Sequence, residues 1–144
     1  MRAVLDTNII VSRFLSSAGF PALIVALWEK GLFELVLTEA ILAEYERVLA
    51  YASVQSRHRM THDEIAQVIS DFRSFAIVVE SMETLDVVVD DPSDNRFLEA
   101  AVAGGCEYIV SGDPHLLRVG EYRGITILPP AAFVAVLEQT PPQL

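Results

Sequence analysis

The chain has 144 residues, of which 52% are hydrophobic, and its formal net charge is −10. This composition excludes a disordered chain, and the negative charge argues against attraction of the whole protein to nucleic acid or to an anionic membrane. The single cysteine, Cys106, excludes an intrachain disulfide and a cysteine-based zinc site, and it predicts a reducing, cytoplasmic location.

The length predicts a single domain over residues 1–139, followed by a flexible tail over residues 140–144. No apolar run is long enough to span a bilayer, and no secretory signal pattern is recognisable. We therefore expect no membrane partner.

The first predicted element is a short buried strand that ends at an acidic residue. Ala3, Val4 and Leu5 form a continuous apolar run, which is typical of a parallel strand covered on both faces. Asp6 follows directly, where parallel sheets place their functional groups. A buried carboxylate has to be paired or bound to a metal. The alternative is that Asp6 only caps the following helix.

Helices and strands alternate along the rest of the chain. A short helix or a turn is predicted over residues 8–16. Helices are predicted over residues 21–30, 38–51, 61–74, 94–103 and 114–118 and from residue 130 onward, and further strands over residues 33–37, 75–79, 108–110 and 125–127. Thr38 should cap its helix, and Thr61 with Glu64 should form a capping box. Residues 55–61 can be a loop, a helix extension or a flap. The alternation predicts an α/β sandwich with a mainly parallel sheet.

Further acidic residues are expected at the same edge of the sheet as Asp6. Asp113 follows the strand over residues 108–110 closely, and Asp94 lies in the first turn of the preceding helix. Helical periodicity places Glu44 at the border of the buried face of its helix. The alternative for Glu44 is a rim residue that pairs with Arg47 or faces solvent.

These carboxylates should require a cation if they converge. Two unit charges about 4 Å apart repel by about 4 kcal/mol at an effective dielectric constant near 20. Ligands that are all oxygen suit Mg²⁺ or Mn²⁺, which can activate water for attack on a phosphate. Asn8, Ser111 and Asn95 lie beside the acids in sequence and could orient ligands or water.

Four motifs together resemble the PIN-domain family, most closely its prokaryotic toxin components of toxin–antitoxin pairs (VapC-like). They cover nearly the whole chain and are Leu5-Asp6-Thr7-Asn8, an inward Glu44, the run from Asp91-Pro92-Ser93-Asp94-Asn95 to Ala100, and Tyr108-Ile109-Val110-Ser111-Gly112-Asp113.

The resemblance implies a three-layer α/β/α sandwich whose five-stranded parallel sheet has the order 3-2-1-4-5. It also implies metal-dependent cleavage of RNA, a cognate antitoxin as partner and a homo-oligomer, with a dimer as the expected form. Asp6, Glu44, Asp94 and Asp113 match the family's acidic residues. Asn8 and Ser111 would support them. Asp91 would be an extra acid of the site or, more simply, a turn residue next to it.

The densest basic patch includes Arg57 and Arg59, which are the candidates for guiding RNA to the site; the alternative is that they belong to an ordinary solvated loop. Two other classes of function remain open. One is a catalytically silent PIN-like protein that keeps the metal site for stability or partner binding. The other is a receiver-like phosphoacceptor, which is disfavoured because the only lysine is Lys30 and the acids after the first strand are not paired.

Overall fold

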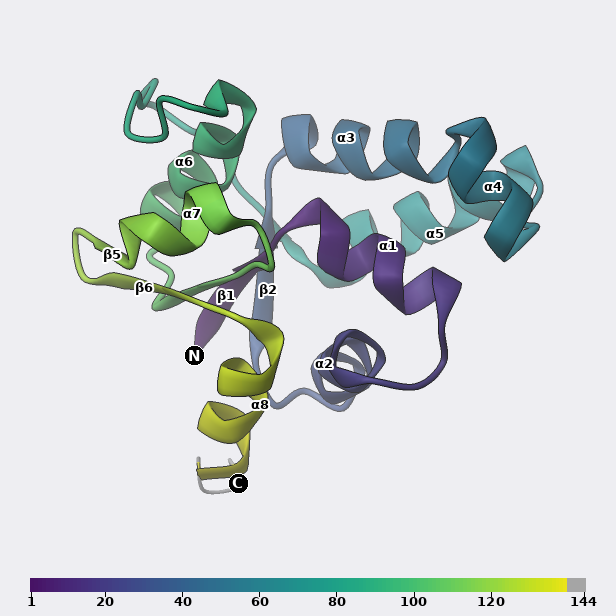
Figure 1. Ribbon diagram of the computed structural model, residues 1–144, viewed down its shortest axis with the longest axis horizontal. Coiled ribbons are helices and arrows are strands. Elements are labelled where there is room, and N and C mark those ends of the chain that lie inside the picture. Colours follow the sequence, from purple (N-terminus) through teal and green to yellow (C-terminus); the bar gives the residue numbers. More distant parts are fainter. Residues whose placement is uncertain (140–144) are drawn as a thin grey trace.

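The computed structural model describes residues 1–139, and residues 140–144, the expected tail, lie outside the described part. The chain forms an α/β structure around one mainly parallel sheet (Figure 1), which confirms the predicted class. The strands are β1 (Arg2–Leu5), β2 (Glu34–Leu37), β3 (Ile77–Val78), β4 (Tyr108–Val110), β5 (Glu121–Tyr122) and β6 (Ile125–Leu128). The helices are α1 (Thr7–Leu15), α2 (Phe20–Glu29), α3 (Glu39–Leu49), α4 (Ala52–His58), α5 (His62–Phe75), the short 3-10 helix η1 (Pro92–Asp94), α6 (Asn95–Ala103), α7 (Pro114–Val119) and α8 (Pro130–Gln139).

The strands lie in the order β3-β2-β1-β4-β6-β5. The first five pair in parallel and follow the expected order 3-2-1-4-5, because β6 is the predicted fifth strand. A receiver-like domain has the order 2-1-3-4-5, so the topology argues against that alternative.

The expected number of five strands is wrong by one, because β5 adds a short antiparallel edge strand next to β6. Arg123 and Gly124 form a two-residue turn between these strands, and both have positive φ angles, 50° and 81°. Such turns suit the twist of a β-hairpin. A strand of two residues leaves no alternating pattern that sequence reasoning could detect.

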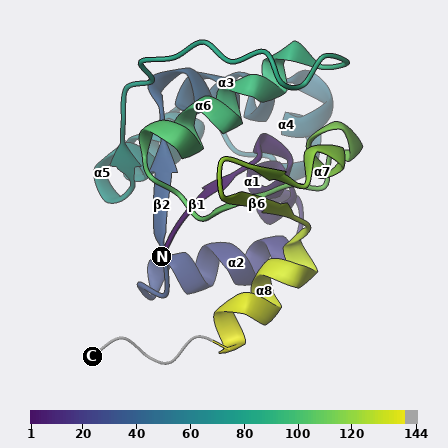
Figure 2. The ribbon, with the colours of Figure 1, turned by 90° about the vertical axis from the view of Figure 1, so that its left-hand side faces the viewer.

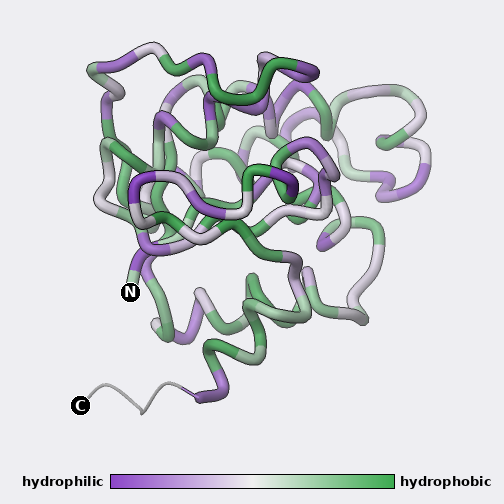
Figure 3. The backbone as a smooth tube through the Cα atoms, turned by 60° about the vertical axis from the view of Figure 1, so that its left-hand side comes forward, coloured by the Kyte–Doolittle hydropathy of each residue, from purple (hydrophilic) through white to green (hydrophobic). Residues whose placement is uncertain are grey.

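Helices cover both faces of the sheet, and β1 lies in the middle of the structure. Figure 2 shows α6 above the sheet and α2 and α8 below it. Ala3, Val4 and Leu5 are completely buried, as predicted for a strand covered on both faces. Figure 3 shows that α2 and α8 are coloured mostly hydrophobic. They pack beneath the strands, where the rings of Phe33 and Phe133 meet edge to face at 5.1 Å.

The predicted helix caps at Thr38 and Thr61 are confirmed. The Thr38 hydroxyl accepts the backbone N–H of Ile41 at 3.2 Å. Thr61 and Glu64 form the reciprocal capping box, with both distances at 3.1 Å. The segment over residues 55–61 is mostly the end of a separate helix, α4, and Arg59, the residue that follows this helix, has a left-handed conformation.

Residues 79–91 form a long irregular connection between β3 and η1, and side chains of α6 hold it in place. The Asn95 side-chain oxygen accepts the backbone N–H groups of Val87 and Val88, both at 2.9 Å. The buried carboxylate of Glu99 accepts the N–H of Leu85 at 2.8 Å. These bonds satisfy backbone groups that have no strand partner there. They also fix the approach of the chain to η1, which carries Asp94.

Within the described residues, no single helix is long and apolar enough to cross a membrane. By length and composition alone, α1 and α2 pass that test as a pair, and they are bent by 100° where they meet.

Candidate active site

The carboxyl ends of β1 and β4 bring two of the predicted acids together. Leu5 of β1 pairs with Val110 of β4, so both strands end at the same level of the sheet. The backbone N–H of Asp6 then donates to the carbonyl oxygen of Val110 at 2.9 Å. Ser111 and Asp113 follow directly after β4, and the expected neighbourhood of Asp6 and Asp113 at the point where the strand order reverses is therefore present.

Asp6 is buried, with 4% of its surface exposed, and its carboxylate is held by donors from both strand ends. The Ser111 hydroxyl donates to one oxygen of Asp6 at 2.6 Å, and the backbone N–H of Asn8 also donates to this carboxylate. Burial raises the pKa of Asp6 to about 6, although the bond from Ser111 acts in the opposite direction. The nearby negative charge of Asp113 raises this pKa further. Asp6 is thus positioned for a positively charged partner.

Asp94 and Asp113 share a hydrogen bond, and their pKa values move in opposite directions. Burial, the bond with Asp113 and the negative charge of Asp113 raise the pKa of Asp94 to about 8. Burial acts against ionisation of Asp113 as well, but the bonds from Asp94 and from the backbone N–H of His115 outweigh it and lower the Asp113 pKa. Without a cation, Asp94 therefore keeps a proton near neutral pH.

The Asp94 oxygen Oδ2 is buried but has no hydrogen-bond partner. Among residues 1–139, no other buried side-chain nitrogen or oxygen lacks a partner. A buried polar atom that lacks a partner costs free energy. A cation beside this oxygen would remove that cost. The arrangement therefore fits a divalent metal ion.

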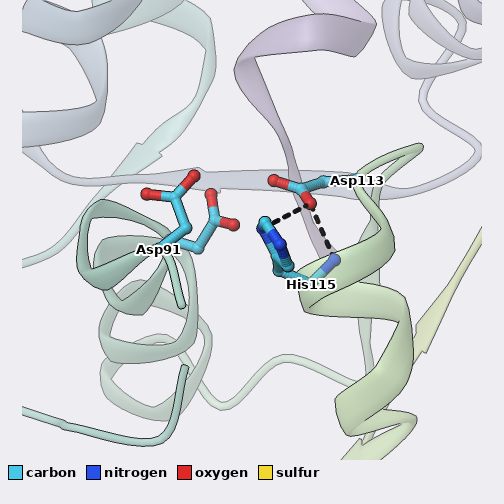
Figure 4. A group of neighbouring side chains, drawn as sticks. Asp91, Asp113 and His115 are labelled. Atoms are coloured by element: carbon cyan, nitrogen blue, oxygen red, sulfur yellow. Dashed lines mark hydrogen bonds and ion pairs between the residues drawn. The ribbon is translucent and has the colours of Figure 1, made fainter. Parts of the chain in front are cut away.

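Asp91, Asp94, Asp113 and His115 form a compact set of donors. One donor atom from each lies within 4.8 Å of the donor atoms of the other three. Figure 4 shows Asp91 approaching from the side of η1 and His115 pointing toward Asp113 from α7. The Asp91 carboxylate also accepts the Ser93 hydroxyl at 2.6 Å. Asp91 was predicted as a turn residue near the site, and here it lies with the buried acids.

Glu44 lies at the rim of the same region. One of its carboxylate oxygens accepts the hydroxyl of Thr7, the residue after Asp6, and the other lies 3.7 Å from an Arg47 nitrogen. The side chain is 23% exposed, and its negative charge contributes to the raised pKa of Asp6. Glu44 therefore contacts the residue after Asp6 and lies near Arg47 at the rim; its role in the active site stays a prediction.

The supporting residues differ in what they contact. Ser111 connects the two strand ends, because its hydroxyl donates to Asp6 and accepts the N–H of Asp113 at 2.9 Å. Asn8 has an exposed side chain and contributes its backbone N–H to Asp6. Asn95 is buried and its amide bonds only backbone groups of residues 87, 88 and 92. It therefore positions the segment that carries Asp94.

The candidate RNA-binding arginines lie in two places. Arg57 on α4 and Arg59 directly after it are exposed, and α4 lies beyond the C-terminal end of α3 (Figure 1). Arg47 and Arg96 instead line a groove of about 380 Å³ that also includes Glu44 and the start of η1. The sequence did not indicate that Arg47 and Arg96 line the same groove. They are 49 positions apart and come to the same groove only when α3 and α6 pack together.

Comparisons with known proteins agree with this architecture. The model of the PIN domain family matches residues 2–115, the part of the chain that contains every acidic residue described above. A chain in the crystal structure of VapBC2 from Rickettsia felis, bound to a DNA fragment from their promoter, superimposes with a TM-score of 0.60. The alignment covers 90% of this chain and 98% of that chain at 12% sequence identity, which shows a shared fold. The comparison with curated proteins gives no match.

The family match covers most of the chain, and the fold and the acidic residues at the sheet edge agree with it. PIN domains are generally nucleases that use divalent metal ions. The chain belongs to the PIN domain family.

Proposed function

We propose that this protein is a divalent-metal-dependent endoribonuclease, which hydrolyses phosphodiester bonds in RNA, and that it is the toxin of a toxin–antitoxin pair. The observation that carries the proposal is the buried, unpartnered Asp94 oxygen among the carboxylates at the sheet edge. A buried carboxylate oxygen without a partner, beside two further carboxylates, favours a bound cation over a purely structural role.

Asp6, Asp94 and Asp113 would hold Mg²⁺ or Mn²⁺, directly or through water. When bound, such an ion activates water and stabilises the negative charge on a phosphate. Ser111 keeps the Asp6 carboxylate in place, and the N–H of His115 orients Asp113 at 2.8 Å. Glu44 is held by Thr7 at the rim, where it can orient the attacking water or help to bind a second ion.

The approach of RNA requires local positive charge, because the whole protein carries a net charge of −10. Arg47 and Arg96 supply it at the groove next to Glu44. Arg47 pairs with Glu44 at 3.7 Å and Arg96 with Glu99 at 3.0 Å, but both arginine side chains are about half exposed, at 59% and 45%, so they remain accessible to a phosphate. We therefore add this pair to Arg57 and Arg59 as candidate RNA contacts.

The proposed activity is tested by incubating the protein with mixed RNA in the presence of Mg²⁺, Mn²⁺ or a chelator. We expect cleavage with either ion and none with the chelator. The Asp6→Asn variant should remain folded, as judged by circular dichroism, and should not cleave. Cleavage that survives both chelation and this substitution would exclude the mechanism. A metal-dependent rise in melting temperature without any cleavage would support the catalytically silent alternative.

The double variant R47Q/R96Q should raise the KM for RNA by about 10-fold, since each lost phosphate contact removes part of the electrostatic attraction. The salt dependence of KM should become shallower by roughly one to two in its logarithmic slope, because fewer counterions are released. The matched control is Arg73→Gln, which removes an exposed arginine on α5 that pairs with Glu39. Equal KM values for the double variant and the control would exclude the groove as a contact.

Charge reversal at Arg57 and Arg59 tests the contact predicted from the sequence in the same assay. A higher KM would place RNA along α4, whereas an unchanged KM would leave both residues as ordinary surface. Comparison with R47Q/R96Q then shows which side of Glu44 the RNA follows.

The VapBC2 neighbour and the family support a cognate antitoxin protein as partner. A homodimer and a cytoplasmic location stay predictions from the sequence. Size-exclusion chromatography with light scattering tests the dimer directly.

A further inference from the structure

His115 lies next to the acidic residues, although no carboxylate motif includes it. It is the second residue of α7, and the carboxylate of Asp113 caps this helix by accepting the backbone N–H of His115. Side chains of a helix tilt toward its N-terminus. The His115 imidazole accordingly points back toward Asp113, with Nδ1 3.5 Å from Oδ1 (Figure 4).

The spacing of the four donors suits one ion. Ligand atoms lie about 2.0–2.2 Å from a small divalent ion, so two ligands of the same ion are separated by at most about 4.4 Å. The donors of His115, Asp91, Asp94 and Asp113 all lie within 4.8 Å of one another, so small side-chain rotations would bring them to these separations.

A second, independent observation supports an ion among these four donors. Asp94 is 5% exposed, and its oxygen Oδ2 lacks any partner. The distance of 3.5 Å between His115 and Asp113 is longer than an ordinary N–H···O hydrogen bond. A simple pairing of His115 with Asp113 therefore leaves the buried Asp94 oxygen without a partner, whereas a shared ion would bind both this oxygen and the imidazole.

We propose that His115 is a ligand of the catalytic ion together with Asp91, Asp94 and Asp113, and that it makes the site prefer Mn²⁺ over Mg²⁺. Imidazole nitrogen is a softer ligand than carboxylate oxygen and is a poor ligand for Mg²⁺, which demands oxygen. Three carboxylates keep the site suitable for Mn²⁺. This inference rests on the cation site of the proposed function, shares Asp94 and Asp113 with it, and adds Asp91 and a nitrogen ligand as direct ligands; Asp6 then acts through water.

The test is pulsed electron paramagnetic resonance of Mn²⁺ bound to the full chain, which detects coupling to a directly ligated nitrogen nucleus. We expect ¹⁴N coupling in the unaltered protein and its loss in His115→Gln. The Mn²⁺ dissociation constant of this variant should rise by about 10-fold or more, and that of Mg²⁺, measured by competition, should change by less than about 3-fold. The matched control His62→Gln, at an exposed position on α5, should keep the coupling.

The outcomes separate this inference from the proposed function. Bound Mn²⁺ without ¹⁴N coupling would overturn the role of His115 and leave the ribonuclease proposal intact. Coupling in a protein that cleaves no RNA would support the role of His115 and count against the proposed activity. Coupling that persists in His115→Gln, or an absence of Mn²⁺ binding to the unaltered protein, would overturn the inference.

Discussion

The Asp94→Asn variant is expected to lose RNA cleavage by more than about 100-fold and to be more stable than the unaltered protein when both lack metal at pH 8. Loss of a group that only orients a metal ligand costs about 10- to 100-fold, so loss of a ligand should cost more. The gain in stability follows because asparagine removes a buried negative charge beside Asp6 and Asp113. Cleavage rates and melting temperatures in chelator measure the two effects.

The matched control is Asp86→Asn, which changes an exposed aspartate in the connection before η1. It should alter neither cleavage nor the melting temperature appreciably. A lower melting temperature of the Asp94→Asn variant in chelator would contradict the conclusion that the buried negative charge of Asp94 destabilises the metal-free protein. Cleavage at the unaltered rate would exclude Asp94 from the metal site.

The melting temperature of the metal-free protein should fall as the pH rises from about 5 to about 8. The folded-state pKa values of Asp6 and Asp94 are raised to about 6 and about 8 from an unperturbed value of 3.8. In this range the folded protein therefore binds more protons than the unfolded chain, and its free energy of unfolding decreases with pH. For Asp6 alone the shift of about two units corresponds to about 3 kcal/mol.

Added Mn²⁺ should reverse this trend, because metal binding requires the carboxylates to lose their protons. The increase in melting temperature on adding Mn²⁺ should therefore grow with pH. At a free concentration 100 times the dissociation constant, binding stabilises the folded state by about 2.7 kcal/mol, or roughly 5–11 °C for a chain of this size. In the Asp94→Asn variant, both the fall of the melting temperature with pH and its increase on adding Mn²⁺ should be smaller. A melting temperature in chelator that stays constant over this pH range would contradict the raised pKa values.

The sequence was sufficient for the features that depend on local pattern. The apolar run before Asp6 and the strand before Ser111 predicted two buried strands with acids at their ends, and both strands lie at the centre of the sheet. The caps at Thr38 and Thr61 were recognisable because a cap needs only residues within one helical turn.

Features that depend on tertiary contacts could not be predicted in the same way. The Asn95 amide was expected to orient ligands or water, but its partners are backbone groups of a connection whose path the sequence did not reveal. His115 had a visible signal, its position two residues after Asp113, but the proximity of Asp91 and Asp94 arises only when α6 and α7 fold toward each other. The roles of all these residues in catalysis stay predictions.

The attachment of the connection over residues 79–91 to α6 has a consequence for protein engineering. The bonds from Asn95 and Glu99 anchor the later part of this connection at residues 85, 87 and 88. Met82 lies before these anchors and is 89% exposed. A peptide tag inserted at Met82 would be separated from η1 by the anchored residues 85, 87 and 88. Met82 is therefore a suitable position for a reporter that leaves the geometry of the acidic residues unchanged.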